Sequence, residues 1–198
     1  MKGKIFNAQE VQAMLNGSKV MFREVIKKPF FTKIEIIDGK RTSYPRQCPY
    51  KVGQKIFCKE SFLQKLGSTQ LPSGEHETFF TGSAVEYAAD GAQERWDNPD
   101  VFYPNWWKKR SAQHMKQEQS RLTLLIKEIR VERLAEISEE DAYKEGVQRT
   151  DEWTGCADDL DFTDAFKFNW NATHKKPEEK FEANPWVWVV SFNVIEIG

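Results

Sequence analysis

The sequence predicts an α+β fold, with mostly antiparallel strands and about three helices. Short segments alternate apolar and polar residues, as half-buried strands do, and capping signals mark short helices between them. No internal repeat or low-complexity tract is present. With 198 residues, 39% of them hydrophobic, the chain has enough apolar side chains for a buried core, and we expect a single domain.

The first predicted helix covers residues 8–16. Asn7 supplies an N-terminal cap, and Glu10, three residues later, completes a capping box. Gly17 follows the last apolar residue and suits the left-handed backbone that often ends a helix. The helix is therefore expected to end just before Lys19, which leaves this lysine on a turn or a short strand.

Two further helices are predicted in the second half of the chain. Ser138 can cap a short helix over 139–145, and Gly146 is placed to end it. Residues 159–169 form the third predicted helix, with five apolar side chains expected to face the core. These side chains belong to Leu160, Phe162, Ala165, Phe166 and Phe168.

Strands are predicted where apolar and polar residues alternate or β-branched residues accumulate. The predicted strands cover 33–37, 55–62, 77–87, 121–131 and 185–195. The last of these is nearly apolar throughout, so we expect it to lie inside the sheet. Asp38 and Gly39 form a turn dipeptide that should reverse the chain after the first strand. Residues 63–76 are expected to form a loop or hairpin tip, and 96–118 a partly exposed loop.

Composition excludes or disfavours several classes of protein. No apolar run approaches about 18 residues, so no membrane-spanning helix is predicted. The first residues lack the apolar stretch of a secretory signal, which predicts a cytoplasmic protein. Cys48, Cys58 and Cys156 are widely spaced and odd in number, a pattern typical of intracellular thiols rather than a disulfide framework.

Motifs for common cofactors and nucleophiles are absent. The three histidines lie far apart in a spacing that does not match metal ligands, so we expect neither a metal site nor a cofactor. The chain has no glycine-rich phosphate loop and no Gly-x-Ser-x-Gly sequence. The usual signatures of nucleotide hydrolysis and serine-hydrolase chemistry are therefore missing.

The formal net charge of −1 hides an uneven distribution of charge. Residues 1–60 contain 13 Lys or Arg and 5 Asp or Glu, whereas residues 61–198 contain 16 and 25. Within the second part, residues 104–133 are basic and residues 134–166 are strongly acidic. Such asymmetry indicates either a side that faces a polyanion or solvated faces that pair in the folded protein.

A short segment combines flat aromatic rings with cations. It consists of Trp106, Trp107, Lys108, Lys109 and Arg110, followed by His114 and Lys116. Binders of single-stranded nucleic acid use this combination because bases stack on the rings while the cations contact phosphates. The alternative is a pair of core or interface tryptophans beside a solvated basic loop. The interleaving of cations and rings favours recognition slightly.

Lys19 and Glu145 are the candidate chemical groups. A lysine beyond a helix end and beside apolar strands is partly desolvated, which favours proton transfer or anion contact. On residue type alone, a solvated lysine is the simpler interpretation. The helix dipole disfavours a carboxylate at the end of the short helix. The position of Glu145 therefore indicates that this carboxylate has a functional role or faces a cation. The alternative is one more anion of an acidic segment.

Four sequence blocks together resemble the ASCH family of the PUA-like superfamily, most of all its longer phage and prophage members. The blocks are residues 17–23 (GSKVMFR), 50–62 (YKVGQKIFCKESF), 114–146 and 182–192 (EANPWVWVVSF). In the first block the family typically has Gly-x-Lys-Thr-x-Thr followed by Arg. In the second it has Gly-Asp, a strand and then Arg-Glu-Thr-Trp. The blocks follow one another in the expected order and span nearly the whole chain.

The resemblance implies one PUA-like domain over 1–198, a mixed, mostly antiparallel β-barrel with helices that flank a cleft. Insertions are then expected at about 63–118 and 147–182. The resemblance also implies association with RNA or modified nucleosides. Some small members of the family are amidohydrolases that remove the acyl group from N4-acetylcytidine, and others are described as ribonucleases.

In these amidohydrolases a lysine, a threonine and a glutamate form the catalytic set. Lys19 and Glu145 match the lysine and the glutamate of that set. Phe22 occupies the position of the threonine, and a phenyl ring has no hydroxyl that could attack a carbonyl. Ser18 could replace the threonine only if the turn were rearranged.

The first functional hypothesis is a binding module for RNA, single-stranded DNA or a modified nucleoside. The residues expected to contact it are Lys19, Phe22, Arg23, Lys59, Trp106, Trp107, Lys108, Lys109, Arg110, His114 and Arg121. The second is a hydrolase in which Lys19 and Glu145 act on a water nucleophile. The third is a phage accessory protein that binds a host protein through the acidic segment 134–166. The first two require Lys19 and Glu145 to face one shared hollow.

Overall fold

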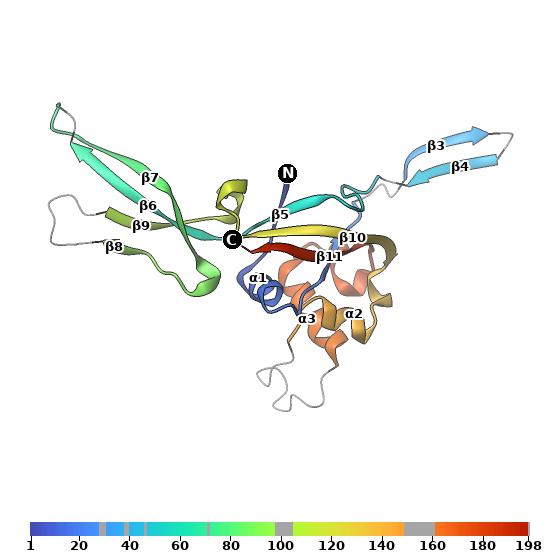
Figure 1. The fold of residues 1–198 in the computed structure, drawn as a ribbon. Coiled ribbons are helices and arrows are strands. Elements are labelled where there is room, and N and C mark those ends of the chain that lie inside the picture. The colour runs from blue at the N-terminus through green and yellow to red at the C-terminus, as the bar shows by residue number, and fades with distance from the viewer. Residues whose placement is uncertain are drawn as a thin grey trace. The chain divides into compact units, whose positions relative to one another are not determined.

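A computed structural model confirms the α+β class (Figure 1). It describes residues 1–27, 31–37, 40–45, 47–70, 72–97, 105–148 and 161–197. The helices in these ranges are α1 (Ala8–Leu15), α2 (Glu139–Lys144) and α3 (Phe162–Thr173). The strands are β1 (Lys2–Ile5), β2 (Met21–Val25), β3 (Phe31–Ile37), β4 (Lys40–Pro45), β5 (Lys55–Lys59), β6 (Phe62–Gln70), β7 (His76–Tyr87), β8 (Arg95–Asp97), β9 (Asn105–Arg110), β10 (Leu122–Arg133) and β11 (Trp186–Ile197).

The largest sheet has five strands in the order β1-β5-β10-β11-β2. It is mixed, because β1 runs parallel to β5 whereas β11 runs antiparallel to β2. The C-terminal strand β11 has a neighbour on each side, which confirms the prediction that it lies inside the sheet. The sheet ends at β1 and β2, and the described strands form no closed barrel, so the expected β-barrel is corrected to an open mixed sheet.

The other sheets are antiparallel. One has the order β7-β6-β9-β8, in which β7, β6 and β9 are the longer strands and β8 is a short edge strand paired with β9. The remaining sheet is the hairpin β3-β4, which confirms the predicted strand pair there. The turn predicted at Asp38 and Gly39 lies outside the described residues.

Two segments predicted as loops form strands instead. Residues 63–76 contain most of β6, and residues 96–118 contain all of β9. The two strands pair antiparallel, with Leu66 opposite Trp106. Each face of β9 mixes a tryptophan with a lysine, so the strand shows no apolar alternation from which the sequence could predict it. Its pairing with β6 and β8 decides its conformation.

Contacts divide the chain into two compact units, which are described separately. Unit 1 comprises Met1–Leu15, Lys55–Leu124 and Val194–Gly198, and unit 2 comprises Asn16–Gln54 and Leu125–Asn193. The predicted insertion 63–118 belongs to unit 1, and the predicted insertion 147–182 belongs to unit 2.

Unit 1 contains α1, which contacts the short helical turn Ala88–Asp90, and the four-stranded sheet. The capping box of α1 is present, because the Glu10 amide donates to Asn7 Oδ1 and the Asn7 amide donates to Glu10 Oε2. These bonds satisfy amides that the first turn of a helix leaves unpaired. The buried core side chains of this unit include Val11, Met14, Ile56, Phe62, Leu63, Met115, Leu122 and Leu124.

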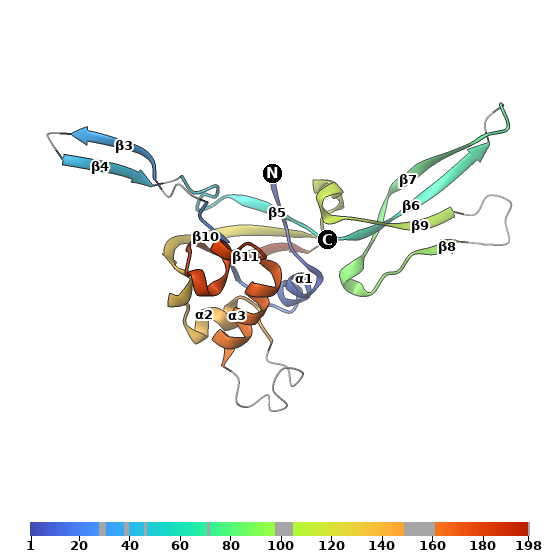
Figure 2. The ribbon, with the colours of Figure 1, turned by 180° about the vertical axis from the view of Figure 1, so that it is seen from behind.

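Unit 2 packs α2 and α3, which lie side by side in Figure 2, with strands β2 and β11. Its core includes Met21, Leu134, Ile137, Ala142, Val147, Ala165, Phe166, Trp170, Val187 and Val189. Ser138 caps α2 as predicted, by accepting a hydrogen bond from the Asp141 amide. Phe168 was expected in the core, but it is exposed on the outer face of α3 because its neighbours Phe166 and Trp170 occupy the inner face. Leu160 lies outside the described residues.

Candidate functional site

Lys19 and Glu145 lie together in unit 2. Gly17, whose φ is 80°, follows α1 in the left-handed conformation, and the chain then forms an isolated antiparallel bridge between Lys19 and Glu145. Lys19 Nζ donates to Glu145 Oε2 at 3.0 Å and to the Glu145 carbonyl at 2.8 Å. Lys19 is 3% exposed and Glu145 is 7% exposed. The structure therefore pairs the two residues that the sequence analysis singled out, in the interior of the unit.

Arg23, on β2, joins this pair to α2 and β10. Its NH1 donates to Glu145 Oε1 at 2.9 Å, and its NH2 donates to Asp141 Oδ2 at 2.9 Å and also to Glu132. Burial by itself lowers the pKa of Arg23, but Glu145 and Glu132 raise it by more, so the guanidinium stays charged. Arg130 completes the set by donating to Glu132 and Asp141.

These six residues form what we call the charge cluster: Lys19, Arg23, Arg130, Glu132, Asp141 and Glu145. It contains equal numbers of cations and anions, so its charges balance. Both carboxylate oxygens of Glu145 accept hydrogen bonds from cations. The cations explain how a carboxylate is tolerated at the end of α2, where the helix dipole disfavours it.

The charge cluster does not present its cations to a polyanion. The Arg23 side chain is fully buried, and Lys19 is nearly so. Phe22, expected to stack on bases, is 2% exposed and packs in the core, with ring centroids 5.3 Å from Tyr50 and 6.0 Å from Phe192. Lys19, Phe22 and Arg23 therefore lie in the interior, and the nucleic-acid contacts expected of them are corrected to structural contacts. Because side chains alternate between the two faces of β2, Phe22 points to the face opposite that of Met21 and Arg23 and packs in the core.

Ser18 does not take the place of the missing threonine at this site. Ser18 precedes Lys19, but its Oγ donates to Asn16 Oδ1 at 2.7 Å on the turn after α1. The arrangement offers a buried lysine and a buried carboxylate within hydrogen-bond distance, which is the geometry that proton transfer needs.

A second buried ion-pair network lies in unit 1 and includes Arg121. This guanidinium donates to both oxygens of Glu60, at 3.0 and 3.1 Å, and to both oxygens of Asp90, at 2.7 and 3.0 Å. It also lies over the Tyr87 ring, 4.0 Å from the centroid. Burial raises the pKa of Glu60, and Arg121 opposes that shift. Arg121 was expected to contact nucleic acid, but it is buried and tied to two carboxylates, so this expectation is corrected.

The basic and aromatic segment forms strand β9 of the four-stranded sheet. Residues that alternate along a strand point to opposite faces, so Trp106, Lys108 and Arg110 share one face and Trp107 and Lys109 share the other. We call the first of these the β9 face. Lys108 and Lys109 are exposed, Trp106 and Arg110 are half-buried, and Trp107 is buried.

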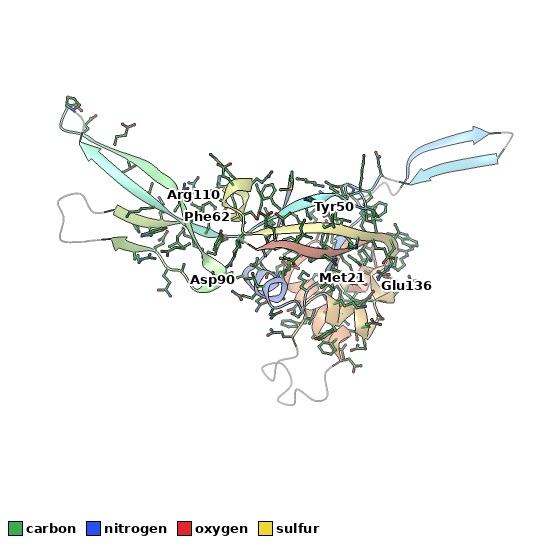
Figure 3. The ribbon with its side chains drawn as sticks, viewed as in Figure 1. Met21, Tyr50, Phe62, Asp90, Arg110 and Glu136 are labelled. Carbon is green, nitrogen blue, oxygen red and sulfur yellow. The ribbon has the colours of Figure 1, made fainter. Side chains whose placement is uncertain are left out.

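Uncharged residues of β6 lie beside the β9 face. Gln64 pairs with Lys108, and Phe62 pairs with Arg110, as the labelled Phe62 and Arg110 show in Figure 3. Residues directly opposite one another in an antiparallel pair lie on the same face. Within the described residues, neither Lys108 nor Lys109 forms an ion pair.

The opposite face of β9 carries carboxylates beside its cations. There Arg95 of β8 lies over the Trp107 ring, 5.0 Å from its centroid, and pairs with both oxygens of Glu86. The amide of Lys109 donates to Glu94 Oε1 at 2.7 Å. Trp107 is thus enclosed, so the base stacking expected of it is corrected to packing within the sheet.

Two further predicted contacts lie close to the end of β9. Lys59 Nζ donates to the Gln113 carbonyl at 2.9 Å, which brings the end of β5 next to the turn that follows β9. His114, in that turn, is exposed.

A pocket of about 460 Å³ opens at the C-terminal end of β7. Its lining residues are Val85, Glu86, Tyr87, Asp90, Gly91 and Ala92. The sequence analysis did not identify this pocket. No local motif marks it, because Asp90 acquires its role from Arg121, which lies far along the chain.

Comparisons with protein-family models, curated proteins and solved structures find no match to this chain. Within the described ranges, no three His, Cys, Asp or Glu side chains are grouped in a way that could hold a metal ion. None of the helices in the described part of the chain is long and apolar enough to cross a membrane.

Proposed function

We propose that this chain binds single-stranded nucleic acid, with RNA preferred, through the β9 face. The observation that carries the proposal is the alternation of Trp106, Lys108 and Arg110 along one face of β9, next to uncharged residues of β6. A half-buried tryptophan offers a surface for base stacking, and cations spaced along the same strand contact phosphates.

The pairing of charges elsewhere in the chain strengthens this choice of surface. The arginines Arg23, Arg95 and Arg121 each bind carboxylates of the protein. Lys108 keeps its charge for an external partner, because it forms no ion pair with the described residues. Exposed cations of this kind release counterions when they bind phosphates, which favours association at low salt.

The preference for RNA rests on the resemblance to the ASCH family, and we propose with it that the fold is of the PUA-like class. The proximity of Lys19 and Glu145 supports the resemblance, because the two positions that match the family's lysine and glutamate come together. The described strands form open sheets rather than a closed barrel, so this part of the proposal rests on the resemblance and on the contact between Lys19 and Glu145.

The proposal is tested by fluorescence anisotropy with labelled RNA and single-stranded DNA over a range of salt concentrations. We expect binding that weakens with salt, and Lys108→Ala should lower the slope of log K against log salt by about 0.7, the value for one phosphate contact on a single strand. Lys109→Ala is the matched control, since it removes the same charge from the opposite face of the same strand. Equal effects of the two variants, or no salt-sensitive binding, would refute the proposal.

Stacking is tested on the same face. Trp106→Ala should weaken binding by about 1–3 kcal/mol, the cost of losing one stacked base, whereas Trp106→Phe keeps a ring and should retain most of the affinity. Circular dichroism checks that both variants fold. If Trp106→Ala binds as tightly as the unaltered protein, stacking on this ring is excluded.

A second candidate function is hydrolysis at Lys19 and Glu145, with water as the nucleophile. The specific observation that favours it is the 3.0 Å separation of Lys19 Nζ and Glu145 Oε2, which satisfies the distance requirement of a general acid and base. The test is incubation with N4-acetylcytidine and with RNA, followed by chromatography. Product that the unaltered protein forms, and that a Glu145→Gln variant shown by circular dichroism to be folded does not form, supports this activity. Absence of product from the unaltered protein rejects it for those substrates.

A further inference from the structure

We infer that the pocket at the end of β7 holds one nucleobase that carries an exocyclic amine, and that Asp90 accepts a hydrogen bond from that amine. The inference rests on the proposed function, because it names the base that the nucleic-acid ligand places in this pocket. It adds a specificity site to a surface whose other contacts, stacking and phosphate binding, are independent of sequence.

The pocket is open to solvent, and its volume suits a small ligand. Its volume of about 460 Å³ lies within the range of pockets that bind small organic molecules. Tyr87 supplies an aromatic ring, and Val85 and Ala92 supply apolar surface. Gly91, with φ of 83°, ends the short helical turn that carries Asp90, and a side chain is absent where the pocket opens.

Asp90 has one acceptor position left for a ligand. Its Oδ1 accepts from Gln12 Nε2 and from Arg121 NH2, both at 3.0 Å, whereas its Oδ2 accepts only from Arg121 NH1, at 2.7 Å. An ionised carboxylate offers about four lone-pair positions, so one on Oδ2 remains. The Asp90 side chain is 47% exposed, which leaves this oxygen within reach of the pocket.

The charge of Asp90 is compatible with a phosphate-bearing ligand. Both carboxylates of the lining are paired with arginines, Asp90 with Arg121 and Glu86 with Arg95, which lowers their repulsion of a nucleic-acid backbone. Arg121 is itself held by Glu60, so Asp90 is fixed in one orientation. A fixed acceptor selects more sharply than a mobile one, because the ordering cost is already met in the free protein.

Sheet pairing connects the pocket to the β9 face. Tyr87 is opposite Phe62, which is opposite Arg110, and Val85 is opposite Gln64, which is opposite Lys108. Each row therefore lies on one face of the sheet and ends on a cation. Strands lie about 4.7–4.9 Å apart, so the cations of β9 stand about 9–10 Å from β7. Val85 and Tyr87 of the pocket lining thus lie on the same side of the sheet as the β9 face, whereas Glu86 lies on the side of Lys109.

A carboxylate acceptor discriminates among the bases. Cytosine presents an N4 amine and adenine an N6 amine, and both donate to a carboxylate, whereas uracil presents the O4 acceptor at the corresponding position. An acceptor facing a carboxylate leaves both groups without a donor, which is unfavourable. The pocket should therefore prefer cytosine or adenine over uracil.

The test compares labelled decanucleotides of cytidine, adenosine and uridine at one low salt concentration. We expect oligocytidine or oligoadenosine to bind at least about tenfold more tightly than oligouridine, as one hydrogen bond to a charged group predicts. Asp90→Asn replaces one acceptor by a donor and should reduce this ratio. Ala92→Leu adds a side chain at the rim of the pocket and should also reduce the ratio of the affinities. Gln93→Leu, just outside the lining, is the control and should leave that ratio unchanged.

The outcomes separate the inference from the proposed function. If all three oligonucleotides bind with equal affinity, the β9 face binds nucleic acid and the base-selective pocket is refuted. If the ratio is present but Ala92→Leu leaves it unchanged in a folded protein, the pocket is not the source of selectivity, and the inference is again refuted. If no oligonucleotide binds, both the proposed function and the inference fail.

Discussion

Replacing Glu145 by leucine should destabilise unit 2 strongly, because it removes the carboxylate that two buried cations share. Lys19 Nζ lies 3.0 Å from Glu145 Oε2, and Arg23 NH1 lies 2.9 Å from Oε1. At an effective dielectric constant of about 20, a pair at this separation attracts by about 5–6 kcal/mol. Part of this attraction offsets the cost of removing the charges from water, and losing one partner of a buried pair typically costs about 3–5 kcal/mol.

The two partners should not respond equally. Lys19→Met should cost less than Glu145→Leu, because Glu145 then keeps its bond to Arg23. The double variant Lys19→Met/Glu145→Leu should recover part of the loss, since it leaves no lone charge at the pair and Arg23 still binds Glu132 and Asp141. These differences give the pair a coupling energy that a double-mutant cycle measures.

The assay is urea unfolding at neutral pH, followed by circular dichroism, with the free energy of unfolding as the measured quantity. Lys144→Ala is the control, because Lys144 forms an exposed pair with Glu140 on the same helix and should leave stability unchanged. Glu145→Gln provides a milder variant if Glu145→Leu does not fold. A loss below about 1 kcal/mol for Glu145→Leu would show that the carboxylate is not held by buried cations, and would refute the reasoning.

Three other predictions concern buried side chains. Phe22→Ala should lower the free energy of unfolding by about 3–5 kcal/mol in the same assay, because the ring fills the core against Tyr50. A decrease as small as that of a surface substitution would show that the Phe22 ring does not fill the core. Burial, and after it Glu24, raises the pKa of Tyr50, so near pH 10 only the unfolded chain ionises this phenol. The free energy of unfolding should therefore fall as the pH rises above 10. The fall should be smaller in Tyr50→Phe, which has no phenol to ionise. Burial also raises the pKa of the Cys58 thiol, so iodoacetamide should label Cys58 only after unfolding. The partly exposed Cys48 should react in the folded protein, and peptide mass spectrometry distinguishes the two sites.

Fewer of the cations expected to contact nucleic acid lie on the protein surface than the sequence suggested. Cations near the start of the chain and near its middle looked alike in the sequence, but Arg23 and Arg121 bind carboxylates in the interior whereas Lys108 is exposed. A sequence shows which residues carry charge and not which charges meet. The partners of Arg23 lie more than a hundred residues away along the chain, so no local pattern reveals them.

Local rules determined much of the secondary structure. The capping box of Asn7 and Glu10 and the cap at Ser138 mark helix starts that the structure confirms, because these bonds join residues three apart. The strands with alternating or continuous apolar residues, such as β10 and β11, were also predictable, since burial of one or both faces leaves a periodic trace.

Tertiary structure alone decided the rest. It made β9 a strand, because pairing with β6 and β8 overrides a sequence without alternation. It brought Lys19 next to Glu145, and it created the pocket by joining Asp90 to Arg121. The physical reason is common to all three. Capping and periodicity act over a few residues, whereas ion pairing, strand pairing and pocket formation depend on the distance in space between residues that are remote along the chain.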